Sequence, residues 1–279
     1  MSRQPSHPPA RVYRRTPQGE LRLWVVDPIT DPAGPDAPRP AVVWFHGGGW
    51  NHGSPTQFQD YAQALAEVGW ASVLVEYRLA QTHHTGPIDA AADAVAAMVY
   101  LRRHAADLGI DPRRLVAAGG SAGGQLAAFC ATMSRRNPLG LHDAELADAR
   151  PDGLVLFNPV FDNSPEGYGA ERFAGRWRDF SPLHNLHDRV PPSLVMLGDA
   201  DVYLPVATAQ AWQKQSTQLG VRSDLEVYAG QKHGFYLPDY HAGSPEMFDR
   251  TLDRVRRFLH EIPAAAPSGP SLPLSSDQP

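Results

Sequence analysis

The sequence predicts an α/β fold, in which a mostly parallel sheet of eight strands carries helices on both faces. Two observations support this prediction. Short apolar runs alternate with stretches of helical periodicity along most of the chain, and that alternation is typical of a parallel sheet covered on both sides. The chain also has 279 residues, 42% of them hydrophobic, which is enough for one domain with a sizeable core.

The first elements are expected to form a hairpin. Residues 11–15 and 21–26 flank a turn that contains Pro17 and Gly19, and Leu21 and Leu23 alternate with the polar Arg22, as in a half-buried strand. The elements that follow are listed in chain order. Parallel strands are expected at 41–45, 71–76, 115–119, 154–157, 193–197 and 225–228, with helices at 58–68, 89–104, 123–135, 205–219 and 245–259.

The predicted domain spans residues 11–262. Residues 1–10 are polar and Pro-rich and lack the apolar stretch of a signal peptide, so we expect a flexible N-terminus and a cytoplasmic protein. Residues 263–279 are rich in Pro, Ala and Ser, and we expect a disordered tail. The one long irregular segment, 161–190, is too short for a separate helical cap domain.

A Gly-x-Ser-x-Gly motif follows the strand expected at 115–119. Its serine is Ser121, and Gly119 and Gly123 flank it. A turn this tight between a strand and a helix holds the serine in strained geometry, and its small neighbours leave the hydroxyl accessible. The helix that follows directs its N-terminus toward the same point and favours negative charge there. Ser121 is therefore the candidate nucleophile.

A second motif, His46-Gly47-Gly48-Gly49-Trp50, follows the strand expected at 41–45. Attack by a serine on a carbonyl creates an oxyanion, which backbone N–H groups of a glycine run can stabilise without obstruction by side chains. We expect Gly48 and Gly49 to donate these hydrogen bonds together with Ala122. His46 is expected to anchor the loop rather than to act as a base.

A serine nucleophile needs a histidine to accept its proton and a carboxylate to orient that histidine. His233 follows the strand expected at 225–228, and both Asp199 and Asp201 follow the strand at 193–197. Functional groups of an open α/β sheet gather at these carboxyl ends of the strands. Asp162 is a weaker candidate for the acid. The order of serine, acid and histidine is that of the α/β-hydrolase arrangement.

Six segments match one family in order. They are His46-Gly47-Gly48-Gly49-Trp50, Glu76-Tyr77-Arg78-Leu79, Leu108-Gly109-Ile110-Asp111-Pro112, Gly119-Gly120-Ser121-Ala122-Gly123-Gly124, Gly198-Asp199-Ala200-Asp201 and His233-Gly234-Phe235. Over about residues 10–262 the chain resembles the α/β-hydrolase fold serine esterases of the hormone-sensitive-lipase-like and feruloyl- and acetyl-esterase-like group.

The resemblance implies an α/β-hydrolase fold without a large cap domain. It also implies a catalytic triad of Ser121, Asp201 and His233, with Asp201 favoured over Asp199 by the Gly-x-x-Asp spacing of the family. The oxyanion hole would then consist of Gly48, Gly49 and Ala122. Lipase-like relatives carry Pro-Glu after Tyr-Arg-Leu-Ala, where this chain has Gln81. This difference leaves the closest subfamily open.

Composition excludes several other functions. A net charge of −5 without a basic stripe argues against nucleic-acid binding, and no apolar run reaches the ~18 residues of a membrane span. No spacing of His, Cys and Glu indicates a metal site, His83 and His84 included, and no cofactor is implied. His241 is expected in a solvated loop and Cys130 in a buried, inert position. The sequence leaves open whether the chain forms a homo-oligomer.

The expected partner is a small-molecule ester with a short acyl group, from an acetylated carbohydrate or an aromatic ester. Aromatic side chains near the carboxyl ends of the strands could stack on its ring, namely Trp50, Phe161, Tyr203 and Phe235, and also Tyr168, Trp177 and Tyr236. Two alternatives are a serine peptidase-like hydrolase, for which the chain leaves no room for a propeller, and a non-catalytic ligand receptor, against which His233 argues.

Overall fold

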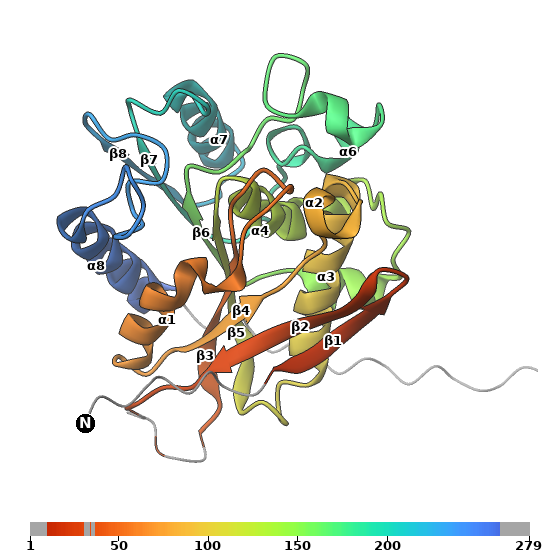
Figure 1. Ribbon diagram of the computed structural model, residues 1–279, viewed down its shortest axis with the longest axis vertical. Helices are drawn as coiled ribbons and strands as arrows, with labels where there is room; N and C mark the ends of the chain where they lie inside the picture. Colours follow the sequence, from red (N-terminus) through yellow and green to blue (C-terminus); the bar gives the residue numbers. More distant parts are fainter. Residues whose placement is uncertain (1–9, 31–33, 35–36, 263–279) are drawn as a thin grey trace, which may run out of the picture.

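The computed structural model describes residues 10–30, 34 and 37–262 of the chain. Eight strands form one sheet in the order β1-β2-β4-β3-β5-β6-β7-β8 (Figure 1). The strands are β1 (Arg11–Thr16), β2 (Gly19–Val26), β3 (Arg39–Phe45), β4 (Ala71–Val75), β5 (Ile110–Gly120), β6 (Gly153–Phe157), β7 (Ser193–Gly198) and β8 (Ser223–Tyr228). The predicted eight-stranded α/β fold is confirmed.

The sheet is antiparallel at one edge and parallel elsewhere. β1 pairs with β2 and β2 with β4 in antiparallel register, whereas all pairs from β4 to β8 are parallel. In the centre Phe45 of β3 lies beside Val75 of β4 on one side and Gly119 of β5 on the other. The carboxyl ends of the parallel strands, and the loops that follow them, therefore meet at one edge of the sheet.

Helices cover both faces, because alternate residues of the buried strands point to opposite sides. Val42 and Trp44 pack with α1 and α8, whereas Val43 and Phe45 pack with α3, α4 and α7 (Figure 1). The helices are α1 (Gln59–Ala66), α2 (Ala80–His83), α3 (Pro87–Arg103), α4 (Ala122–Thr132), α5 (Asp143–Ala149), α6 (Trp177–Phe180), α7 (Val206–Gln218) and α8 (Pro245–Glu261).

The sequence did not predict three short helices, α2, α5 and α6. Each has seven residues or fewer, so periodicity has too few turns in which to appear. Segment 161–190 contains α6 together with 3₁₀ turns at Ala170–Phe173 and Leu183–Asn185, and it forms no separate domain. It lies beside α4 and above the sheet edge, at the upper right of Figure 1.

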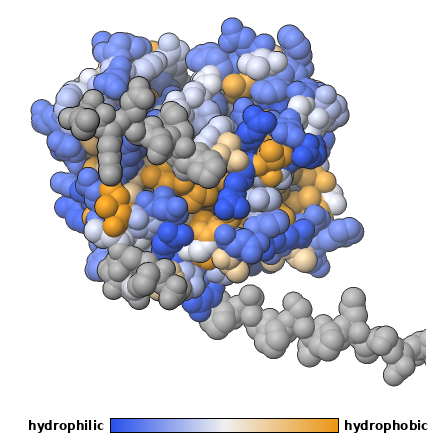
Figure 2. All heavy atoms as spheres, turned by 60° about the horizontal axis from the view of Figure 1, so that its bottom comes forward, coloured by the Kyte–Doolittle hydropathy of each residue, from blue (hydrophilic) through white to orange (hydrophobic). Residues whose placement is uncertain are grey.

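The predicted flexible tails lie almost entirely outside the described residues. Residues 1–9 and 263–279 are not among them. In the described ranges no helix has the length and apolarity to cross a membrane. Figure 2 turns the molecule so that the lower side of Figure 1 comes forward. On this face a band of apolar residues is surrounded by a mostly hydrophilic surface.

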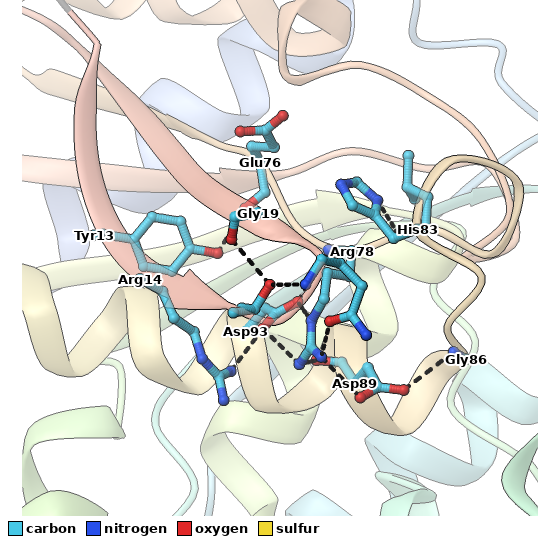
Figure 3. A network of polar contacts seen from close by, with 12 residues as sticks. Tyr13, Arg14, Gly19, Glu76, Arg78, His83, Gly86, Asp89 and Asp93 are labelled. Carbon is cyan, nitrogen blue, oxygen red and sulfur yellow. Dashed lines mark hydrogen bonds and ion pairs between the residues drawn. The ribbon is translucent and has the colours of Figure 1, made fainter.

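A buried ion pair joins the antiparallel edge to α3 and to the chain after β4 (Figure 3). Asp93 of α3 is fully buried, and its carboxylate accepts hydrogen bonds from Nε of Arg78 at 2.8 Å and from Nη1 of Arg14 at 2.6 Å. The backbone N–H of Arg78 donates to the same carboxylate at 3.0 Å. This cluster holds in place the segment that carries Tyr77, whose hydroxyl donates to the carbonyl of His46 at 2.7 Å.

We expect Asp93→Asn to lower the free energy of unfolding by about 3–5 kcal/mol, because it removes the buried charge that pairs with the buried Arg78 and with Arg14. Asp148→Asn is the matched control, since Asp148 pairs with the half-exposed Arg103 at the surface, and it should cost less than about 1 kcal/mol. Urea unfolding followed by circular dichroism measures both. Equal losses in the two variants would contradict a structural role for the Asp93 cluster.

Candidate active site

Ser121 lies in the tight turn between β5 and α4, where the sequence places the candidate nucleophile. Its φ of 56° and ψ of −120° are strained for a residue with a side chain. The backbone N–H of Ser121 donates to the carbonyl of Phe157 at 2.9 Å, which ties the turn to β6. A Cβ on Gly123 would lie 2.0 Å from the carbonyl oxygen of Phe45, so only glycine allows α4 to approach the end of β3 this closely.

The glycine loop after β3 lies beside this turn. Gly48 and Gly49 have φ of 120° and 62°, and a Cβ on Gly48 would lie 2.0 Å from the carbonyl oxygen of His52. In the part of the chain that the structure describes, the N–H groups of Gly48 and Gly49 donate to no acceptor. Ala122 is the first residue of α4, where backbone N–H groups precede the hydrogen bonds of the helix.

His233 and Asp201 form a hydrogen-bonded pair. His233 Nδ1 lies 2.7 Å from Oδ2 of Asp201, whose side chain is buried. Burial opposes ionisation of Asp201, but the hydrogen bond and charge of His233 and the N–H groups of Tyr203 and Leu204 outweigh it and lower the pKa of the carboxyl. Asp201 is thus ionised at neutral pH, and Nδ1 of His233 is assigned the proton that it shares with this carboxylate.

The other two candidate carboxylates do not contact His233. Asp199 is exposed and accepts a hydrogen bond from the N–H of Gly230 at 2.6 Å. Asp162 accepts from the N–H of Ser164 at 2.7 Å and lies 3.7 Å from His184. The structure therefore brings Asp201 to His233, as the spacing of the motif favours.

Ser121 and His233 line one cavity of about 340 Å³. Among the described residues the Ser121 hydroxyl makes no hydrogen bond to His233; in catalytic sites such a hydrogen bond often tightens only when substrate binds. Glycines 47–49 form one wall, and the remaining walls include Tyr168, Arg172, Tyr203 and Tyr240. Residues from five separate segments thus meet at the carboxyl edge of the sheet.

Comparison with known proteins supports the family. The BD-FAE family model matches residues 28–165. The chain is 29% identical over 255 residues to Esterase LipC of Mycobacterium tuberculosis, covering 82% of this chain and 60% of LipC. It is 40% identical over 249 residues to Lipase 2 of Moraxella sp., covering 73% of this chain and 56% of that lipase.

A solved structure agrees over nearly the full length. The propionate-bound form of a thermophilic esterase from Thermogutta terrifontis, Est2, superposes with a TM-score of 0.83 at 31% identity, covering 94% of this chain and 97% of Est2. This chain belongs to the α/β-hydrolase serine esterases. Other solved forms of Est2 carry butyrate or are phosphonylated by cyclosarin. The chain spans about 60% of the length of LipC.

Of the seven aromatic residues expected near the substrate, four do not line the cavity of this α/β-hydrolase, namely Trp50, Phe161, Trp177 and Phe235. Trp50, Phe161 and Phe235 are all 1% exposed or less, so that prediction was wrong for them. Their rings are held by core contacts: Trp50 Nε1 donates to Gln125 at 3.2 Å, and Phe161 stacks on Trp212 at 4.3 Å between ring centroids. Tyr203, in contrast, lines the cavity, is 61% exposed and meets His233 edge to face.

The sequence analysis did not single out Asn158, which directly follows β6. This residue is fully buried, has a φ of 31°, and places its Nδ2 at 3.2 Å from Nδ1 and 3.4 Å from Nε2 of His233. Its Oδ1 has no hydrogen-bond partner among the described residues. A polar residue directly after a buried strand of the sheet was the only available signal, and Asn158 offers it.

The surroundings of His46 indicate a structural role rather than a catalytic one. The ring is buried, stacks on Tyr77 at 4.2 Å between centroids, and places Nδ1 at 2.8 Å from the carbonyl of Gly47. Burial lowers the pKa of His46 to about 4, so the ring is neutral in the folded protein. His46 thus anchors the glycine loop, as the sequence suggests.

Cys130, His83 and His241 also have structural rather than catalytic surroundings. Cys130 is buried in α4, and burial raises the pKa of its thiol. His83 accepts a hydrogen bond from the N–H of Leu79, and His241 packs on Tyr240. No group of three or more potential metal ligands occurs within the described ranges.

The pKa of His46 predicts a pH dependence of stability. An unfolded chain takes up a proton on this histidine below about pH 6.5, whereas the folded protein does so only near pH 4. The free energy of unfolding should therefore fall by up to about 3 kcal/mol from this group as the pH drops from 6.5 to 4. Unfolding by urea at several pH values should show a shallower fall for His46→Gln; parallel curves for the two proteins would contradict the assignment.

Proposed function

We propose that this chain is a serine carboxylesterase, with Ser121, His233 and Asp201 as its catalytic triad. One observation carries the proposal: a serine with φ of 56° at a strand–helix turn shares a cavity with a histidine whose Nδ1 lies 2.7 Å from a buried carboxylate. Strained backbone at such a turn is maintained where it serves a function.

The geometry supports acyl transfer in two stages. Ser121 Oγ attacks the ester carbonyl and passes its proton to Nε2 of His233, while Asp201 stabilises the imidazolium through Nδ1. The N–H groups of Gly48, Gly49 and Ala122 receive the oxyanion, an interaction for which removal of one donor costs about 10²–10³-fold in kcat. Collapse breaks the carbon–oxygen bond to the alcohol, which takes the proton from His233. Water then repeats the sequence on the acyl-enzyme and releases the acid.

The proposed substrates are esters of short acyl chains, with acetylated carbohydrates and aromatic esters as candidate classes. Est2 is seen with propionate and with butyrate bound, which supports short acyl groups for its relatives. The site is a cavity of about 340 Å³ whose rim carries the rings of Tyr168, Tyr203 and Tyr240. Phenol rings suit stacking on an aromatic or sugar ring.

Labelling with a fluorophosphonate tests the proposal. We expect one adduct per chain, mapped by mass spectrometry to the peptide that contains Ser121, and none on Ser121→Ala. Hydrolysis of aryl acetates should fall by ~10⁴-fold or more in that variant. A chain that binds esters but neither forms the adduct nor turns them over would be a ligand receptor, which would overturn the proposal.

Two aspartates in one loop provide a matched pair of variants. Asp201→Asn should lower kcat by ~10²–10⁴-fold, because the amide cannot hold the imidazole in the required tautomer. Asp199→Asn should retain activity, since within the described residues the Asp199 carboxylate accepts a hydrogen bond from the N–H of Gly230 and none from His233. Steady-state kinetics with an aryl acetate, at equal melting temperature, compares them. The opposite ranking would transfer the acid role to Asp199.

Acyl length tests the preference for short chains. A buried methylene contributes about 0.8 kcal/mol only where an apolar wall receives it. With a series of 4-nitrophenyl esters, kcat/KM should peak at about two to four carbons and fall beyond about eight. An optimum at octanoate or longer would show instead that the segment 161–190 encloses long chains as a lid does.

A further inference from the structure

Arg172 extends from the segment 161–190 into the wall of the cavity that contains Ser121. Its Nη1 donates to the carbonyl of Gly49 at 2.8 Å. Gly49 is a proposed oxyanion donor, so this hydrogen bond holds the guanidinium beside the proposed oxyanion hole. Within the described ranges Nη2 of Arg172 makes no hydrogen bond, and the side chain is 41% exposed, which leaves donors for a ligand.

A second donor lies beside the guanidinium. A Cβ built on Gly49 would lie 3.4 Å from Nη1 of Arg172 and 3.5 Å from the hydroxyl of Tyr168. Both residues line the cavity, and the guanidinium carbon lies 5.8 Å from the centre of the Tyr168 ring. The absent side chain of Gly49 thus leaves a space bounded by the Arg172 guanidinium, which pairs well with carboxylates, and by the Tyr168 hydroxyl, which can donate a further hydrogen bond.

The charge of the cavity is opposite to that of the protein. The chain carries a net charge of −5, counted with neutral histidines, yet no aspartate or glutamate lines the cavity, and Arg172 does. The carboxylate of Asp201 is buried and paired with His233, and that of Glu171, which lies 3.3 Å from Nε of Arg172, belongs to a side chain that is 73% exposed. A cleft lined by one sign of charge attracts ligands of the other sign.

We infer that the esterase acts preferentially on esters that carry a carboxylate, and that Arg172 and Tyr168 bind this group. The inference rests on the proposed ester hydrolysis and adds the substrate class. The carboxylate could belong to the acyl part or to the alcohol part of the ester. In both cases the Arg172 guanidinium contacts the substrate and determines specificity, while the triad performs the reaction.

Two pairs of esters test the inference. Monoethyl succinate against ethyl butyrate places the charge on the acyl side, and 4-acetoxybenzoate against its methyl ester places it on the alcohol side. For each pair, pH-stat titration gives kcat/KM of the anionic ester and of the neutral ester in the full chain and in each variant. The quantity compared is the first value divided by the second. Comparing this ratio between variants cancels the intrinsic reactivity of each ester.

In at least one pair we expect Arg172→Gln to lower the ratio by about tenfold and Arg172→Lys, which keeps the charge but loses the planar fork, to lower it less. Arg176→Gln is the matched control. Arg176 lies on the same segment, pairs with Asp179 and does not line the cavity, so its loss should leave both kcat/KM values unchanged. Raising KCl from about 20 to about 500 mM should slow only the anionic ester in the unmodified protein.

Three results would overturn the inference. These are ratios that agree within about twofold among all variants for both pairs, equal losses for the anionic and the neutral ester of both pairs in Arg172→Gln, and no effect of salt on the anionic esters. Equal losses would make Arg172 a positioning residue of the glycine loop. Failure of the proposed function is distinguishable, because then no ester of either charge is hydrolysed and the fluorophosphonate does not label Ser121.

Discussion

Close contact between the end of β3 and the first turn of α4 is the constraint on which the site depends. A Cβ on Gly119 or Gly123 would lie within 2.5 Å of the carbonyl oxygen of Phe45, so the two backbones touch. This contact holds Ser121 at a φ of 56°, which costs about 1–3 kcal/mol of strain. Because the glycine loop begins immediately after Phe45, the same contact sets the position of its N–H groups relative to the serine hydroxyl.

Buried polar contacts extend this rigidity away from the serine. The Asp93 carboxylate holds Arg78, the neighbouring Tyr77 donates to the carbonyl of His46, and the ring of His46 lies against the glycine loop. Each group is buried and hydrogen-bonded, as buried polar groups must be to avoid a large desolvation cost. Stability and site geometry are therefore coupled through α3, which contributes no residue to the cavity wall.

The segment 161–190 forms part of the cavity wall and no separate cap domain. Phe161 and Phe173 are buried in the core, and the guanidinium of Arg172 binds the carbonyl of Gly49. The ring of Trp50, on the glycine loop, packs against Tyr168 and Phe173. The apolar rings of Trp50, Phe161 and Phe173 pack in the core and attach the segment to the sheet. The side chains of the segment that line the cavity are those of Tyr168 and Arg172.

The sequence alone determined the strands, the long helices and the placement of Ser121, Asp201 and His233 at one edge. Each of these residues lies within a few positions after the end of a parallel strand, and the carboxyl ends of parallel strands meet at one edge of the sheet. Only the tertiary structure showed the contact between Asp201 and His233 that the motif spacing favours, the burial of Trp50 and Phe235, and the approach of Asn158 and Arg172 to the site. These outcomes depend on the direction of side chains and on packing between segments far apart in the chain, which local periodicity does not encode.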